Sequence, residues 1–91
     1  MEIISITELT PYYDHCKSFY GKAHILDCGN KFVLRSYETN VAYVDKKTKS
    51  LHRLWSDWSA TTGRHVNEFS HQFAGKWCGK KDWDRMDVER I

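Results

Sequence analysis

The sequence predicts a single α+β domain over residues 1–91: a small antiparallel β-meander of three to five strands packed against one amphipathic helix, with a short C-terminal helix. Its 91 residues are 41% hydrophobic and 14% aromatic, which fits one domain with a small core rich in rings. Short runs of β-branched and aromatic residues alternate with turn signals through the first half. After Trp58 the apolar period becomes helical.

The expected meander begins with an edge strand over residues 2–9, which Pro11 ends because proline donates no ladder hydrogen bond. Four further strands are expected over residues 23–27, 31–37, 41–45 and 50–55. The connections between these four strands are short, so neighbouring strands should pair antiparallel. The aromatic segment between the edge strand and the second strand has neither period and is expected to be irregular.

The main helix is expected over residues 60–74, with Ser59 as N-cap and Gly75 as the residue that ends it. Gly63 inside this helix should cost roughly 1 kcal/mol relative to alanine. One helical face carries the residues expected to pack on the sheet: Thr62, Val66, Phe69 and Phe73.

A final short helix is expected with Asp82 as N-cap and Ile91 at its end. Trp83, Met86 and Asp87 would lie on one side of it. So short an element is marginal alone and requires Trp83 to dock on the rest of the domain.

The chain lacks the motifs of the common nucleotide-binding sites, hydrolases and metalloproteases, so we expect no enzymatic activity and no required cofactor. A small enzyme would require acidic or histidine side chains to converge in the fold. No run approaches the length of a membrane span, and the N-terminus has no signal-peptide pattern. We expect a cytoplasmic protein with no membrane partner.

The three cysteines are an odd number without a CxxC pair, so they cannot form a complete disulfide framework. One interpretation is a structural zinc bound by Cys16, Cys28, His71 and Cys78, since thiolate and imidazole are the ligands that zinc prefers. The other is that the cysteines pack as small apolar residues while the histidines lie on the surface.

The net charge of +2 is unevenly distributed: residues 46–91 hold ten Lys and Arg against six Asp and Glu, and residues 1–45 hold four against six. Lys46, Lys47, Lys49 and Arg53 concentrate positive charge in the turn over residues 46–53. Such a turn could bind nucleic-acid phosphate, and the alternative is a solvated turn whose charge protects a sheet edge.

Exposed aromatic residues would provide a surface for a partner, because Tyr and Trp anchor protein interfaces. Most of the rings are instead needed for so small a core, and Phe19 and Trp55 are expected there. The candidate partner-binding residues, apart from the three lysines of the turn, are Tyr12, Tyr13, Lys17, Tyr20 and Trp58.

Two regions of the sequence carry a recognisable pattern. The residues are Tyr12-Tyr13-Asp14, Lys17-Ser18-Phe19-Tyr20-Gly21-Lys22-Ala23, Trp58-Ser59-Ala60-Thr61-Thr62, Arg64-His65-Val66 and Glu68-Phe69. With these segments the chain resembles a family of small uncharacterised proteins from Gram-positive bacteria and their phages. The similarity covers roughly residues 9–74, and the tail over residues 76–91 diverges from the family pattern.

What the resemblance implies is a phage or mobile-element protein in a bacterial host, where small proteins of this kind bind and block a host protein. Anti-CRISPR inhibitors are a prominent class of them. We therefore expect a non-enzymatic inhibitor that docks on a protein lobe of a Cas9-type nuclease, since the chain is not acidic enough to imitate DNA. The alternative is a nucleic-acid-binding accessory protein that uses the basic turn.

Overall fold

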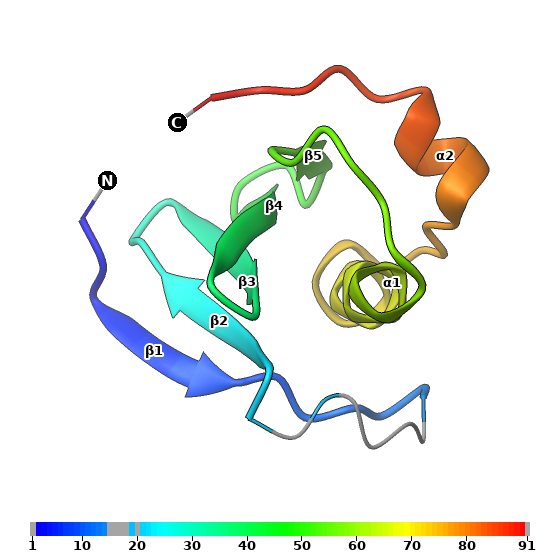
Figure 1. Ribbon diagram of the computed structural model, residues 1–91. Helices are drawn as coiled ribbons and strands as arrows, with labels where there is room; N and C mark the ends of the chain where they lie inside the picture. Colours follow the sequence, from blue (N-terminus) through cyan, green and yellow to red (C-terminus); the bar gives the residue numbers. More distant parts are fainter. Residues whose placement is uncertain (1, 15–18, 20, 91) are drawn as a thin grey trace.

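A five-stranded antiparallel sheet with a long helix against one face forms the body of the protein (Figure 1). This architecture, seen in a computed structural model that describes residues 2–14, 19 and 21–90, confirms the α+β meander expected from the sequence. The strands follow one another across the sheet in chain order. The elements are β1 (Ser5–Glu8), β2 (Ala23–Asp27), β3 (Lys31–Ser36), β4 (Thr39–Asp45), β5 (Leu51–Arg53), α1 (Ala60–Ala74) and α2 (Lys80–Asp84).

The β3–β4 hairpin turns earlier than the sequence suggested. The expected strand included Tyr37, but β3 ends at Ser36. Tyr37 has a φ of 56°, in the left-handed region, and this backbone cannot continue a strand. A β-bulge between Leu34 and Arg35 then shifts the register with β4.

The main helix has the predicted bounds and caps. The Ser59 hydroxyl accepts a hydrogen bond from the Thr62 N–H at 3.1 Å, and Gly75 ends the helix at a φ of 71°. The predicted apolar face packs on the sheet, where Val66 and Phe69 are fully buried and the Phe73 ring contacts Phe32.

One polar cluster is buried between α1 and the sheet. The Ser36 hydroxyl on β3 lies 2.7 Å from Nδ1 of His65 and 3.0 Å from the Thr62 hydroxyl, and all three residues are buried. The Phe19 ring packs edge-on against His65 and is fully buried, which confirms its expected place in the core. Mutual hydrogen bonding offsets the cost of burying these groups.

The predicted C-terminal helix is wrong in its bounds. Its N-cap is Gly79, and the Asp82 carboxylate reaches back to accept the Gly79 N–H from the third helical position. The helix ends at Asp84, far short of the expected end. Trp83 does dock as predicted: it is fully buried, and its indole N–H donates to the Asp57 carbonyl at 2.8 Å.

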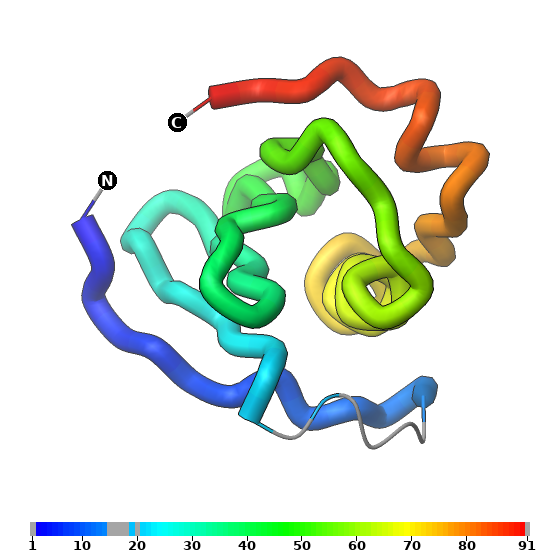
Figure 2. Tube along the Cα trace, viewed as in Figure 1, coloured from blue at the N-terminus to red at the C-terminus, as the bar shows by residue number. Residues whose placement is uncertain are grey.

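After α2 the chain runs back past β5, as Figure 2 shows in orange and red. Val88 forms a parallel bridge with Arg53, and the Glu89 N–H donates to the Arg53 carbonyl at 2.7 Å. The C-terminal segment thus lies beside β5 at this edge of the sheet. Among the described residues, neither helix is long and apolar enough to cross a membrane.

Arg53 fastens this segment from inside the fold. Arg53 is 8% exposed, and its guanidinium donates to four backbone carbonyl oxygens, two before α1 and two in or just after α2. It also lies over the Trp83 ring, 5.1 Å from the ring centre. The carbonyls belong to Trp55, Ser56, Trp83 and Met86.

Candidate functional site

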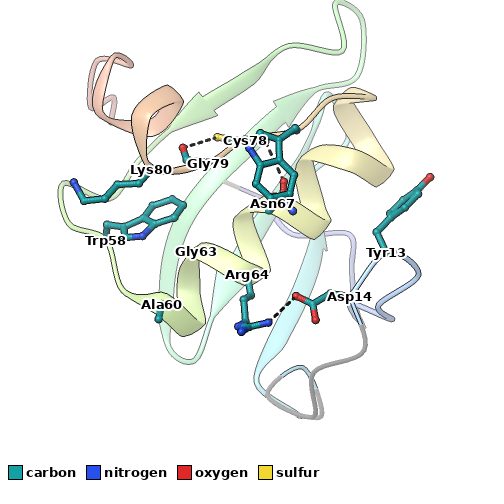
Figure 3. A pocket seen from close by; sticks show the side chains of 11 residues that line it. Tyr13, Asp14, Trp58, Ala60, Gly63, Arg64, Asn67, Cys78, Gly79 and Lys80 are labelled. Carbon is teal, nitrogen blue, oxygen red and sulfur yellow. Dashed lines mark hydrogen bonds and ion pairs between the residues drawn. The ribbon is translucent and has the colours of Figure 1, made fainter.

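A groove of about 620 Å³ opens on the side of α1 that does not face the sheet (Figure 3). Helix α1 provides its floor, because Ala60, Gly63, Arg64 and Asn67 recur at helical spacing on one face. In Figure 3, Trp58 and Tyr13 lie on opposite sides of the helix. The remaining lining residues are Asp14, Trp77, Cys78, Gly79 and Lys80.

Trp58 reaches the groove because Gly63 has no side chain. A Cβ added to Gly63 would lie 2.7 Å from Cε2 of the Trp58 ring and 2.9 Å from Cη2. Such separations are well inside van der Waals contact, so any larger residue would displace the indole. Gly63 was expected only to weaken the helix, but its lack of a side chain provides the space that the Trp58 ring occupies.

Trp77 borders the groove on the segment between the two helices. The side chain is 64% exposed, although tryptophan is usually well buried. Its ring packs edge-on against His71 of α1, with ring centres 5.8 Å apart. The left-handed Gly75 turns the chain at the end of α1, and Gly79 leaves room beside the indole nitrogen.

Tyr13 is held at the opposite side by a buried carboxylate on α1. Glu68 is 1% exposed, and its Oε1 accepts the backbone N–H groups of Tyr13 at 2.8 Å and Asp14 at 2.9 Å. Gln72 donates to Oε2 of Glu68 and to the Thr10 carbonyl. These bonds dock residues 10–14 on the helix, with the Tyr13 ring 4.8 Å from His71.

Charged and polar groups alternate with the rings. Arg64 pairs with Asp14 at 3.4 Å, as the dashed line in Figure 3 shows, and Lys80 pairs with Asp84 at 2.7 Å. The side-chain oxygen Oδ1 of Asn67 accepts the Cys78 N–H at 3.1 Å. Within the described part of the chain, Asn67 Nδ2 has no acceptor, so this amide can donate to a partner in the groove.

Cys78 contributes bulk to the groove wall rather than reactivity. The side chain is 2% exposed, and burial, with a smaller effect of the Asp82 carboxylate, raises the pKa of its thiol to about 11. Near neutral pH the group is therefore the protonated thiol, which is a poor nucleophile.

Two of the predicted partner-binding residues, Tyr13 and Trp58, line this groove, and Tyr12 lies beside it in the chain, 72% exposed. Lys17 and Tyr20 lie outside the described residues. Sequence reasoning missed Trp77, Arg64 and Asn67. The available signals were Gly75 and Gly79, each two residues from Trp77, and a second helical stripe opposite the apolar one.

The three lysines of the predicted basic turn lie between β4 and β5, and none of them lines the groove. Lys46 is engaged: its ammonium donates to Asp27 at 2.7 Å and lies over the Phe32 ring. That hydrogen bond is the main reason why the pKa of Asp27 is lowered. Lys47 and Lys49 are exposed. Since Arg53 is buried, two of the four cations remain available to an external anion.

The candidate zinc ligands occupy separate elements. Cys28 lies in the β2–β3 turn with its thiol 3.7 Å from the Leu26 carbonyl, whereas His71 is on α1 and Cys78 follows it. Residues 2–14, 19 and 21–90 contain no group of three or more residues that could hold a metal ion. Cys16 lies outside the described residues. The Nδ1 atom of His71 is buried without a hydrogen-bond partner in that part of the chain.

A second polar cluster joins β4 and β5 to the C-terminal segment. Nε2 of His52 lies 2.9 Å from the Ser50 hydroxyl, and its Nδ1 lies 2.6 Å from Oε2 of Glu89. The Tyr43 hydroxyl donates to Oε1 of Glu89 at 2.7 Å, and its ring stacks on His52 with centres 4.5 Å apart. Burial, then the adjacent carboxylate, raises the pKa of Tyr43 to about 12.

The order Ser50–His52–Glu89 is that of a serine hydrolase triad, but acyl transfer also requires donors for an oxyanion. The amides on the same turn are engaged: the N–H groups of residues 47 and 48 donate to the Asp45 carboxylate, and that of residue 49 donates to the Asp45 carbonyl. We interpret the cluster as an attachment for the C-terminal segment.

Comparison with known proteins places the chain in a family. A family model described as a family of unknown function, DUF8033, matches residues 7–85. The chain belongs to the DUF8033 family. The DUF8033 match includes α1, Trp58, Trp77 and the strap over residues 10–14, so the whole groove lies within it. No curated protein and no solved structure matches the chain.

Proposed function

We propose that this DUF8033 protein is a non-enzymatic inhibitor that binds another protein through the groove on α1. The observation that carries the proposal is the convergence of Trp58, Trp77, Tyr13 and Arg64 around one groove. Trp, Tyr and Arg are the residues that contribute most binding energy at protein interfaces. Trp77 and Tyr13 are each 64% exposed, although burying such rings would stabilise a small domain.

The groove fits a protein segment better than a charged small molecule. Its two cations are each paired with a carboxylate of the same chain, so little net charge is directed at a ligand. The Asn67 amide can instead bond a backbone carbonyl, while the flanking rings cover apolar side chains. A protein segment with an apolar side chain and exposed backbone carbonyls would match both the rings and the Asn67 amide.

The resemblance to proteins of Gram-positive bacteria and their phages supports a partner in the bacterial cytoplasm. A Cas9-type effector is the first such partner to test, and we propose docking on one of its protein lobes. A net charge of +2 supports this mode, because a mimic of nucleic acid would have to be acidic to enter the basic channels of the effector.

Purified protein should form a stoichiometric complex with a guide-loaded Cas9-type effector and reduce its DNA cleavage. Trp77→Ala should weaken binding by about 30-fold, the loss typical of an interface hot spot. Tyr37→Ala is the matched control, because Tyr37 is also exposed but lines no part of the groove. A chain that neither binds nor affects cleavage excludes this partner class.

A second candidate function is nucleic-acid binding by the basic turn, favoured by the exposure of Lys47 and Lys49. With two available cations, the logarithm of the binding constant should fall with the logarithm of salt concentration at a slope of about −2. Replacing both lysines with glutamine should abolish binding. Unchanged affinity in that variant would exclude the turn.

A further inference from the structure

The side chains of the groove on α1 present more hydrogen-bond donors than acceptors. In the part of the chain that the structure describes, no acceptor receives a bond from Asn67 Nδ2 or from the indole nitrogens of Trp58 and Trp77. Asp14 carries the single carboxylate among the described lining residues, and that carboxylate pairs with Arg64. A ligand that matches these side chains therefore supplies acceptors and few donors.

The aromatic rings of the groove are separate from one another. Trp58 packs against Trp83, whereas Tyr13 and Trp77 each contact His71, and among the described residues none of the three groove rings contacts another. A compact cation held in an aromatic cage would need rings that face a common centre, and the two cations among the lining residues would repel it. Separate rings instead suit an extended segment that meets one ring after another.

The length of the groove floor matches one turn of a polyproline II helix. Ala60 and Asn67, the first and last floor residues, lie seven positions apart on α1. At about 1.5 Å per residue the floor is therefore about 10 Å long. One turn of polyproline II has three residues of about 3.1 Å each, or about 9 Å. Successive residues of one such turn can thus reach different side chains of the groove.

We propose that the segment bound in this groove is rich in proline and adopts the polyproline II conformation, a proposal that rests on the proposed function of the groove as a protein-binding site. Proline has a backbone carbonyl and no N–H, so it supplies acceptors without donors. Polyproline II has no internal hydrogen bonds, and its carbonyls are therefore free to accept from Asn67, Trp58 and Trp77. Grooves lined by aromatic residues bind such segments through the proline rings.

Two other kinds of segment match the groove less well. A helix bonds its carbonyls internally, so it would leave the donors of the groove without acceptors. A β-strand brings an N–H with every carbonyl and needs a row of acceptors beside it. The floor of the groove is itself a helix, whose carbonyls are bonded within it, and the Tyr13 hydroxyl could accept one bond at most places along a strand but not a row of them.

Decaproline with blocked ends is the probe that tests the proposal by nuclear magnetic resonance on isotope-labelled protein. The indole N–H resonances of Trp58 and Trp77 and the side-chain amide resonances of Asn67 should shift as the peptide is added. The indole of Trp55, which packs against the core and does not line the groove, should not shift. A Gly-Ser peptide of the same length, which has N–H groups and no rings, should cause no shifts.

Asn67→Asp tests the match of donor to acceptor. The variant keeps the oxygen that accepts the Cys78 N–H but replaces the amide donor with a second oxygen. It should weaken decaproline binding by about tenfold, because a peptide carbonyl would then face an acceptor. Trp77→Ala should weaken binding by at least as much. Tyr37→Ala, which changes an exposed ring outside the groove, should leave the affinity unchanged.

The results separate this proposal from the protein-binding function on which it rests. If decaproline shifts neither groove indole while a photoreactive residue at position 77 still crosslinks to a host protein, the partner is not proline-rich but the groove still binds protein. If neither occurs, both proposals are wrong. Equal shifts with the Gly-Ser peptide, or an unchanged affinity in Asn67→Asp, would also overturn the proline-rich ligand.

Discussion

The indole of Trp58 lies directly over the α carbon of Gly63, in space that any other residue would fill with its side chain. Glycine is otherwise unfavourable in the middle of a helix, by about 1 kcal/mol relative to alanine. The chain accepts that cost at a position where it allows a tryptophan to border the groove. The contact thus links a local exception in the helix to the proposed binding surface.

Gly63→Ala should therefore destabilise the protein by about 1–3 kcal/mol, the usual cost of overpacking, in spite of the better helix propensity of alanine. Urea denaturation followed by circular dichroism measures the change. In a Trp58→Ala background the same substitution should be neutral or stabilising, since the ring that it displaces is gone. Equal effects in the two backgrounds would contradict the contact.

Glu68→Ala should release the strap over residues 10–14 from α1. The N–H groups of Tyr13 and Asp14 would lose their acceptor, at a cost of about 1–3 kcal/mol in the free energy of unfolding. Glu68→Gln keeps an oxygen at Oε1 and should cost less. Hydrogen exchange at the two amides should accelerate in the alanine variant, and unchanged protection there would show that the carboxylate does not hold the strap.

Arg53→Met should destabilise the protein by about 2–4 kcal/mol, because four carbonyl oxygens lose a charged donor in a buried site. Exchange should become faster at Glu89, whose N–H donates to the Arg53 carbonyl. Lys47→Met is the control from the same stretch of sequence: Lys47 is exposed, so its loss should change stability by less than about 0.5 kcal/mol. Comparable losses in the two variants would contradict a structural role for Arg53.

Attachment of the C-terminal segment should weaken as the pH becomes acidic. Hydrogen bonds from Tyr43 and then His52 lower the pKa of Glu89 below its usual 4.5. A carboxyl whose pKa is lower in the folded state contributes stability that is fully present above the unfolded pKa and is lost as pH falls through the folded one. This contribution should therefore be present near neutral pH, begin to fall as the pH drops below about 4.5, and disappear once the pH is below the lowered pKa of the folded state.

The difference in unfolding free energy between the wild type and Glu89→Gln, measured from neutral to acidic pH, isolates this effect. Asp27 and Asp45 also have lowered pKa values, but both are present in each protein and cancel in the difference. The difference should shrink toward zero in acid. A difference that stays constant with pH would show that the Glu89 carboxylate does not hold the segment.

The sequence predicted the parts of the fold that local rules determine. Ser59 and Gly75 bounded α1 correctly, because a capping hydroxyl and a left-handed glycine act within one helical turn. The prediction that Asp82 is an N-cap was wrong. An aspartate suits both the N-cap and the third helical position, and only the fold distinguishes the two. The prediction that Tyr37 belongs to a strand was also wrong, because Tyr37 lies in the turn of a hairpin whose position depends on the pairing of β3 with β4.

Much of the groove could not be predicted from the sequence, because it depends on contacts between segments that are not neighbours in the chain. Tyr13 and Trp58 were candidates because aromatic residues cluster around them in the sequence, but Trp77 borders the groove only because the chain turns at Gly75 after α1. Arg53 was assigned to the basic turn by its charge and its neighbours. Its burial against the Trp83 carbonyl of α2 depends on a contact 30 residues along the chain, which local patterns do not contain.

Photo-crosslinking in a bacterial host tests the central claim, that the groove on α1 binds a protein, without prior choice of the partner. A photoreactive phenylalanine analogue at position 77 should give discrete adducts with one host protein, and Tyr13→Ala in the same chain should reduce them. The same analogue at position 37, which is exposed but outside the groove, should give none. Identical adducts at both positions, or none at position 77, would contradict a protein-binding groove.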